Sequence, residues 1–233
     1  MANEIGWSFM LKKISAVLFF CISLPALANS NECGLPDSAI KAYEQNIIDH
    51  CSQISEEICN GSFSDVRDVL SSYIRYDSQG LSLDDKVAIL AYSFDLYQPV
   101  NSALRKHDGS MNAYLPVMNC ALSKLPDVNQ TVYRNDNLPS SVLDQWQEGA
   151  TITYDSYMST TTIPNKCNSD PDEVYCASTK QYLSIHAKHG KNISAYSAYP
   201  EEKEVLFLPA TKFKITKRSD LGGGKSELIL DEL

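Results

Sequence analysis

Cysteine pairs with the CxxC spacing do not occur in this 233-residue sequence, and histidine occurs only 4 times. The closest two histidines, His186 and His189, lie in a strand-like segment, where a spacing of three residues sends side chains to opposite faces. A zinc site usually needs several cysteine or histidine ligands that converge on one point. The sequence therefore argues against a metal site.

Basic residues are in the minority, with 20 Lys and Arg against 29 Asp and Glu and a formal net charge of −9. A chain with this balance repels a nucleic-acid backbone overall, so we expect no nucleic-acid partner. Low-complexity tracts and internal repeats are also missing, and 43% of the residues are hydrophobic. These features predict a globular protein with a substantial core.

Hydrophobic runs long enough to span a membrane comfortably are absent as well. The apolar run at residues 14–24 is too short and follows Lys12 and Lys13, and a small-x-small sequence stands at residues 26–28. This order is typical of a secretory signal peptide. We expect residues 1–28 to be cleaved near Ala28 and the mature protein to be secreted, without stable insertion into a membrane.

The mature chain would keep six cysteines, an even number, which in an exported protein favours up to three disulfides. They can pair in 15 ways, and they are Cys33, Cys51, Cys59, Cys120, Cys167 and Cys176. A local bond between Cys167 and Cys176 is one hypothesis, since both flank an irregular acidic stretch.

Helical patterns occupy about residues 37–128. Ser64 can begin a helix that ends at Tyr76, and Ser82 with Asp85 resembles a capping box that opens another. Further helical turns are predicted at residues 100–106 and 113–122.

After Pro126 the sequence pattern changes from helical periodicity to short runs that are typical of strands. These runs are residues 131–133, 151–154, 182–187, 205–208, 212–216 and 227–230. The glycines at 222–224 predict a hairpin turn before the last run. A helical part followed by a β-rich part at residues 131–233 predicts an α+β fold, and the lack of a clear linker favours one domain, residues 29–233.

Three polar groups stand at the ends of separate strand-like runs. The first is Arg134; the second is Ser159-Thr160-Thr161; the third is Glu202-Lys203-Glu204, within the run YPEEKEVLFLP. In an extended segment, Glu202 and Glu204 would project to the same face, where two carboxylates repel one another. Each group alone has an ordinary explanation as a surface charge or a strand edge.

Their order along the chain resembles the arginine, serine, glutamate class of mono-ADP-ribosyltransferases, and most of all the secreted bacterial toxins that modify arginine. The resemblance by motif covers about residues 131–209. It implies a helical region on a mixed or antiparallel split β core, NAD as co-substrate and no metal. A GxGxxG sequence after a strand is missing, so NAD would not be bound in a Rossmann crevice.

The resemblance also implies how NAD would be held. Arg134 would bind its phosphate or ribose through a charge-assisted fork. Asn135, where many members have glycine, would offer backbone groups to the nicotinamide amide. Ser159 would hydrogen-bond the catalytic glutamate, while Thr160 and Thr161 would support the nicotinamide pocket; Thr161 departs from the usual Ser-Thr-Ser pattern by one methyl group.

The two glutamates would then have different roles. Glu204 would bind the nicotinamide-ribose 2′-hydroxyl and stabilise the positive charge that develops as the glycosidic bond breaks, as carboxylates do in glycoside hydrolysis. Glu202 would orient the acceptor guanidinium and help to deprotonate it. Tyr199 matches the aromatic residue of the family's substrate-recognition loop, although packing on the core is the alternative.

The function expected from the resemblance is the transfer of ADP-ribose from NAD to an arginine of a target protein, in a host or competitor cell, by a monomeric toxin. Two alternatives stay open. The first is an NAD glycohydrolase, and the second is a disulfide-stabilised exported binding protein that is not an enzyme. The last four residues, Leu-Asp-Glu-Leu, are similar to a retrieval tail, but they also fit a closing strand.

Overall fold

A computed structural model of the protein describes residues 33–54, 62–73, 80–164 and 179–233. The predicted signal peptide and three cysteines, Cys59, Cys167 and Cys176, therefore lie outside the described residues, and so does the predicted disulfide between Cys167 and Cys176. Residues Asn31–Leu233 form one compact unit. Within the described ranges, none of the helices combines the length and the apolar character needed to cross a membrane.

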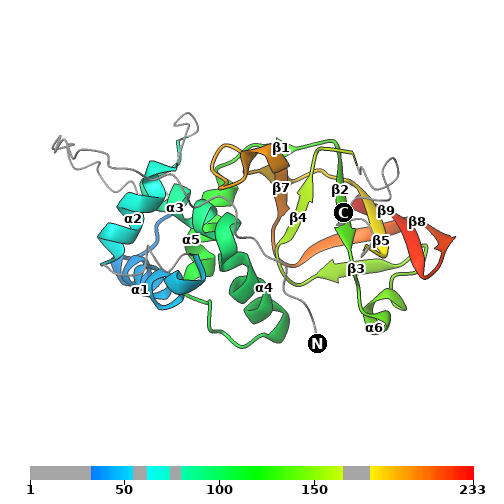
Figure 1. Ribbon diagram of the computed structural model, residues 1–233, viewed down its shortest axis with the longest axis horizontal. Helices are drawn as coiled ribbons and strands as arrows, with labels where there is room; N and C mark the ends of the chain where they lie inside the picture. Colours follow the sequence, from blue (N-terminus) through cyan, green and yellow to red (C-terminus); the bar gives the residue numbers. More distant parts are fainter. Residues whose placement is uncertain (1–32, 55–61, 74–79, 165–178) are drawn as a thin grey trace, which may run out of the picture. The chain divides into compact units, whose positions relative to one another are not determined.

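The first part of the described chain is helical, and Figure 1 shows these helices gathered together. They are α1 (Asp37–Ile54), α2 (Phe63–Ser72), α3 (Leu83–Ala91), the π-helix η1 (Tyr92–Leu96), α4 (Tyr97–Lys106) and α5 (Tyr114–Ser123). A disulfide between Cys33 and Cys120 joins the segment before α1 to α5. Cys51 is disulfide-bonded as well, so the expectation of disulfides is confirmed for the described cysteines.

Capping boxes begin two of these helices. Ser82 and Asp85 form the predicted one, in which the Ser82 N–H donates to Asp85 at 2.7 Å and the Asp85 N–H donates to Ser82 Oγ at 3.2 Å. The helix predicted to start at Ser64 instead has Ser62 as its N-cap, with Asp65 as the carboxylate partner. The prediction was wrong because Ser62 has an acidic residue three positions later, which Ser64 lacks.

The segment from α3 to α4 is one continuous helix with a π turn in its middle. There the Tyr97 N–H donates to the Tyr92 carbonyl, five residues back. Pro99 follows immediately and has no N–H to give to the carbonyl one turn earlier, which favours an irregular turn at this place. This π turn carries Tyr92, Ser93 and Phe94, which contact the site described below.

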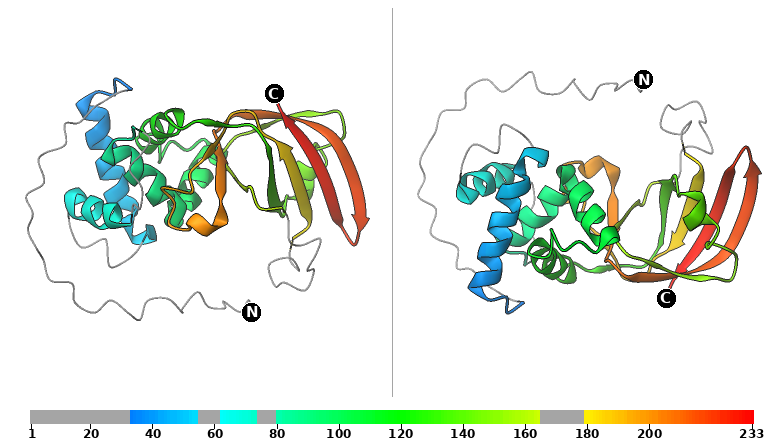
Figure 2. Two further views of the ribbon diagram at one scale, coloured as in Figure 1. Left: turned by 90° about the horizontal axis from the view of Figure 1, so that it is seen from above. Right: turned by 90° about the horizontal axis from the view of Figure 1, so that it is seen from below.

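The rest of the chain forms a nine-stranded sheet in the order β1-β6-β7-β4-β2-β5-β9-β8-β3. The strands are β1 (Asp127–Val128), β2 (Thr131–Asp136), β3 (Thr151–Tyr154), β4 (Met158–Thr161), β5 (Gln181–His186), β6 (Gly190–Asn192), β7 (Glu204–Phe207), β8 (Thr211–Gly222) and β9 (Lys225–Glu232), and a short helix, α6 (Ser140–Leu143), follows β2. Both views in Figure 2 show β8 and β9 as a long hairpin. Its turn contains Gly222, Gly223 and Gly224, all at positive φ, as predicted.

The sheet is nearly divided between β2 and β4. These two strands pair only at Tyr133 and Thr161, whereas β2 pairs with β5 over six consecutive residues. Neighbouring strands are antiparallel except β5 and β9, which are parallel. A mixed, largely antiparallel sheet with this division, preceded by helices, confirms the predicted α+β fold with a split β core.

Two hydrophobic clusters use opposite faces of β7. Leu206 packs into the cluster of the helices, whereas Val205 and Phe207 belong to the cluster of the sheet. Side chains alternate along a strand, so Glu204 shares the face of Leu206 and is directed toward the helical cluster. The helices therefore form one wall of the region around Glu204.

Candidate active site

The strands β4 and β7 bring the predicted serine and glutamate together. In their antiparallel register Ser159 lies opposite Leu206, and Thr161 lies opposite Glu204. Ser159 and Glu204 are thus diagonal neighbours on one face, and the Ser159 hydroxyl hydrogen-bonds the Glu204 carboxyl group. The predicted contact between these two side chains is present.

Glu204 is the most perturbed carboxyl group of the described residues. Its exposed fraction is only 6%, and burial raises its pKa to about 7, with a further rise from the nearby Glu202 carboxylate. The hydrogen bond from Ser159 and the positive charge of Arg134 act in the opposite direction. A buried glutamate that is about half ionised at neutral pH is typical of a catalytic group.

Arg134 lies in β2, directly across the division of the sheet. Its Nε donates to Asp136 Oδ2 at 2.8 Å, and its Nη1 donates to the Ser159 carbonyl oxygen at 2.8 Å. The second bond spans the point where β2 and β4 share only one residue pair. The guanidinium is therefore held in one orientation beside Ser159, with its charge close enough to act on Glu204.

The two threonines after Ser159 hold the backbone of the glutamate segment. Thr160 Oγ1 donates to the Val205 carbonyl at 2.6 Å, and Thr161 Oγ1 donates to the Glu202 carbonyl at 2.6 Å. Their hydroxyls thus bind backbone carbonyl groups on both sides of Glu204. Asn135, in β2, lies opposite Tyr182 of β5 and is half-buried.

Glu202 and Glu204 are not on one extended strand, so that expectation was wrong. Residues Pro200–Glu202 form a 3₁₀ turn, and Lys203 adopts a left-handed conformation with φ 51°. Glu202 is consequently exposed while Glu204 is buried. The two carboxylates still lie close enough that Glu202 raises the pKa of Glu204. Although the residue is exposed, partial desolvation of its carboxyl group, together with Glu201, raises the pKa of Glu202 itself.

Tyr199 lies at the start of this turn, where its carbonyl accepts the Glu202 N–H at 3.1 Å. The residue is 37% exposed, and its ring makes an edge contact with Phe94 of η1, at 6.3 Å between ring centroids. The loop is also fixed to η1 because the Ala198 N–H donates to Ser93 Oγ at 2.8 Å. Tyr199 and Glu202 are thus placed together on a loop that the helices support.

Tyr92 of η1 was missed by the sequence analysis. Burial raises the pKa of its hydroxyl well above the ordinary value, and the Glu204 carboxylate adds to this rise. Asn101 donates to the Tyr92 hydroxyl at 2.9 Å and accepts the Tyr157 N–H at 3.1 Å, so it links η1 to the residues just before Ser159. A polar tyrosine within a hydrophobic helix was the only available signal, and it does not identify a partner.

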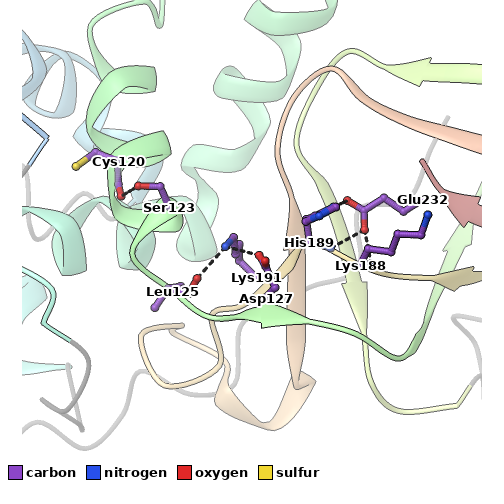
Figure 3. Close-up of polar contacts among 8 residues, drawn as sticks. All are labelled: Cys120, Ser123, Leu125, Asp127, Lys188, His189, Lys191 and Glu232. Atoms are coloured by element: carbon purple, nitrogen blue, oxygen red, sulfur yellow. Dashed lines mark hydrogen bonds and ion pairs between the residues drawn. The ribbon is translucent and has the colours of Figure 1, made fainter.

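His186, His189 and the last residues of β9 have structural partners, some of which are drawn in Figure 3. Glu232, which is 4% exposed, accepts the N–H groups of Lys188 and His189. His186 pairs with Asp231 at 2.6 Å. Leu230, Asp231 and Glu232 therefore belong to β9, as the closing-strand interpretation of the last residues expects.

Lys191 lies in β6, between β1 and β7, and its contacts with Leu125 and Asp127 are drawn in Figure 3. Its ammonium group is buried and donates to the Leu125 carbonyl at 2.8 Å and to Asp127 at 2.6 Å.

In the part of the chain that the structure describes, no group of three or more His, Cys, Asp or Glu side chains could hold a metal ion.

The family model described as NAD:arginine ADP-ribosyltransferase matches residues 68–233, which is more than half of the chain and includes every residue of this site. The chain belongs to this family. The resemblance noted from the order of Arg134, Ser159 and Glu204 is thereby confirmed, and so is NAD as the co-substrate of the family.

Two relatives of similar sequence are also named as arginine ADP-ribosyltransferases. The chain is 34% identical over 141 residues to the putative NAD(+)–arginine ADP-ribosyltransferase Mav of Mycobacterium avium, covering 60% of this chain and 16% of that protein. It is 32% identical over 148 residues to the NAD(+)–protein-arginine ADP-ribosyltransferase Tre1 of Serratia proteamaculans, covering 61% of this chain and 31% of that protein. The match therefore spans less than a third of either relative.

A solved structure with a similar fold is that of the ADP-ribosyltransferase HopU1 of Pseudomonas syringae pv. tomato. The two structures superpose with a TM-score of 0.64 at 19% identity, over 85% of this chain and 98% of that chain. This similarity supports the fold, with its helices and its mixed sheet.

Proposed function

We propose that this protein is a mono-ADP-ribosyltransferase that transfers ADP-ribose from NAD to an arginine of a target protein and releases nicotinamide. The observation that carries the proposal is the buried Glu204, which hydrogen-bonds Ser159 and lies in the electrostatic range of both Arg134 and Glu202. The contact between Arg134 and Ser159 also speaks against the alternative of a binding protein with merely decorative charges.

Arg134 would bind the phosphates or ribose of NAD. Asp136 and the Ser159 carbonyl orient its guanidinium, so less conformational freedom is lost when the substrate binds. Asn135, next to it, would present backbone groups to the nicotinamide amide. The positively charged nicotinamide ring would then favour the ionised form of Glu204, because a nearby opposite charge lowers the pKa of a carboxyl group.

Glu204 would act on the sugar. As the bond between the ribose C1′ and the nicotinamide nitrogen breaks, nicotinamide leaves with the bonding electron pair and positive charge develops on the ribose. A carboxylate already held in a site of low polarity stabilises that charge strongly, and Ser159 fixes its orientation. Thr160 and Thr161 would act as positioning residues, since their hydroxyls hold the backbone on either side of Glu204.

Glu202 would act on the acceptor. A guanidinium nitrogen forms the new bond to C1′ and must lose a proton, which the Glu202 carboxylate accepts. The raised pKa of Glu202, which comes from partial desolvation and from Glu201, makes it a better base than an isolated glutamate. Tyr199 would contact the acceptor from the same loop.

Around this site we propose the organisation expected from the sequence. Residues 1–28 would be removed on export, residues 29–233 would form a single ADP-ribosyltransferase domain, and the mature protein would act as a secreted monomeric toxin on a protein of a host or competitor cell. The acidic net charge of −9 supports a protein target over a nucleic acid.

The test uses the mature protein with NAD and agmatine, a small amine that carries one guanidinium group. Nicotinamide release measures cleavage of NAD, and labelled agmatine measures transfer. Glu204→Gln should lose both by about a hundredfold or more, whereas Glu202→Gln should lose transfer much more than hydrolysis. Asp144→Asn alters an exposed carboxylate at the C-terminal end of α6. This control should change neither nicotinamide release nor transfer.

Two results would contradict the proposal. If Glu204→Gln cleaves NAD as well as the wild type, the assignment of Glu204 is wrong. If the wild type cleaves NAD but labels neither agmatine nor any arginine peptide, the protein is an NAD glycohydrolase.

A further inference from the structure

A row of aromatic rings extends from the acceptor loop onto the helices. Tyr199 contacts Phe94 edge-on at 6.3 Å, and Phe94 contacts Tyr73 at the end of α2 edge-on at 5.5 Å. Tyr97, one turn after Phe94, contacts Tyr92 at 6.3 Å. We call the set Tyr73, Phe94, Asp95, Tyr97 and Tyr199 the aromatic-acidic surface.

Three of these rings are unusually exposed. Tyr73, Tyr97 and Tyr199 are 47%, 42% and 37% exposed, and they make up half of the six large hydrophobic side chains that are exposed in the described residues. Scattered exposed apolar side chains are normal in soluble proteins, but a group of aromatic rings beside a functional loop is typical of a binding surface.

The charges at this surface are negative. Asp95 lies between Phe94 and the buried Leu96 in η1, and its carboxylate acts on the Tyr199 hydroxyl together with those of Glu202 and Glu201. Lys203, which follows Glu202 and ends the 3₁₀ turn in a left-handed conformation, is the one positively charged residue next to Glu201 and Glu202 in the sequence of the loop. Aromatic faces and carboxylates both attract cations, so the chemistry of the surface fits positively charged side chains.

The surface is built before any partner binds. Ser93 Oγ accepts the Ala198 N–H at 2.8 Å and donates to the Leu90 carbonyl at 2.9 Å, so η1 and the acceptor loop are joined although they are 105 residues apart in the chain. Phe94 and Ala198 also pack against the helical cluster. A pre-organised surface loses little conformational entropy on binding.

We propose that the aromatic-acidic surface binds basic side chains that flank the target arginine, so that the preferred acceptor is an arginine within a lysine- or arginine-rich segment of a folded or extended protein. This inference rests on the proposed transfer to arginine at Glu202. It adds a second requirement to the substrate: the guanidinium that reacts reaches Glu202, while neighbouring cations contact Asp95 and the rings of Tyr97 and Tyr199.

The experiment compares acceptors that differ only in the charge around one arginine. Short peptides carry a single arginine flanked by lysines, by serines or by glutamates, and agmatine serves as an acceptor without flanks. With saturating NAD, kcat/KM for the lysine peptide should exceed that for the glutamate peptide by about tenfold or more, chiefly through KM, and the difference should shrink at high salt.

Two variants connect this preference to the surface. Asp95→Asn and Tyr73→Ser should each reduce the preference for the lysine peptide by about threefold to tenfold, while nicotinamide release and agmatine labelling stay within about twofold of wild type. Leu221→Ser, at an exposed hydrophobic position in β8, and Asp144→Asn are the matched controls and should keep the full preference.

The outcomes separate this inference from the proposed function. If agmatine is labelled but the three peptides react equally, the surface does not select basic segments and the inference is overturned. Equal losses with agmatine and with the lysine peptide in Asp95→Asn would also overturn it, because the effect would then lie in catalysis. If the wild type labels no guanidinium compound at all, the proposed function itself fails.

Discussion

Replacing Glu204 by glutamine should stabilise the protein at alkaline pH even though it removes activity. The glutamate titrates at about 7 in the folded protein, against 4.5 for an ordinary glutamate. Between these two pH values the folded state keeps a proton that the unfolded chain has released, so stability falls as the pH rises. Glutamine has a similar shape and no charge, so it is free of this loss.

The size of the effect follows from the difference between the two pKa values. A difference of about 2.5 corresponds to about 3 kcal/mol in the free energy of unfolding, because each pKa unit contributes about 1.36 kcal/mol. About 2.5 kcal/mol of this should develop between pH 5 and pH 8, the rest having been lost below pH 5. At pH 8 the variant should therefore melt about 5 to 10 °C above the wild type.

The assay is urea unfolding of wild type and Glu204→Gln from pH 5 to pH 8, with the disulfides intact, followed by circular dichroism and by the fluorescence of the buried Trp146. Subtracting the free energy of unfolding of one protein from that of the other at each pH removes the contributions of other titrating groups. Glu232→Gln is a useful contrast, since its carboxylate accepts two backbone N–H groups and its loss should destabilise by about 1 to 3 kcal/mol.

A difference between wild type and Glu204→Gln that stays constant from pH 5 to pH 8 would refute the reasoning. It would mean that Arg134 and Ser159 offset the effect of burial on Glu204. A variant less stable than wild type at pH 8 would show that the ionised carboxylate is itself a stabilising partner of the Arg134 guanidinium.

Three other predictions concern the same region. The kcat/KM for NAD, which reports groups of the free enzyme, should fall about tenfold for each pH unit below about 7, because the ionised form of Glu204 is needed; a flat profile from pH 5 to 8 would contradict this. Tyr92→Phe keeps the ring contact with Tyr157 but leaves the Asn101 amide without its acceptor, so it should destabilise by about 1 to 2 kcal/mol in urea unfolding and lower nicotinamide release. Gly190→Ala would place a methyl group 2.8 Å from Val205 Cγ1, and the forced shift of β7 should cost about 1 to 3 kcal/mol of stability and reduce activity, whereas unchanged melting would show that β7 adapts freely.

The parts of the fold that could be predicted from the sequence are those that depend on neighbouring residues. The capping box of Ser82 and Asp85 needs two residues three positions apart, and the glycine turn at residues 222–224 needs only backbone freedom. The strands β1 and β6 were not predicted, because two or three residues give no periodic pattern. The parallel pairing of β9 with β5 depends on residues far apart in the chain and leaves no local signal.

The candidate site shows the same limit. The order of Arg134, Ser159 and Glu204 was visible because each of them lies in or next to a run that reads as a separate strand, namely β2, β4 and β7. The side-by-side placement of the two glutamates was predicted wrongly, since the left-handed backbone at Lys203 is uncommon for a residue other than glycine. Tyr92 lies at the start of the π turn in η1, and its proximity to Glu204 depends on a packing of η1 against the sheet that the helical pattern of the sequence does not reveal.

The position of β9 has a consequence for the order in which the protein can fold. This strand is made after all the others, yet it lies between β5 and β8 in the interior of the sheet. Until it arrives, β5 exposes an unpaired edge, and the hydrophobic side chains of Leu228 and Leu230 are missing from the sheet cluster. Pairing across such a separation is slow, so we expect β9 to join β5 late in folding. The sheet that carries Arg134, Ser159 and Glu204 would therefore be complete only when this last strand is in place.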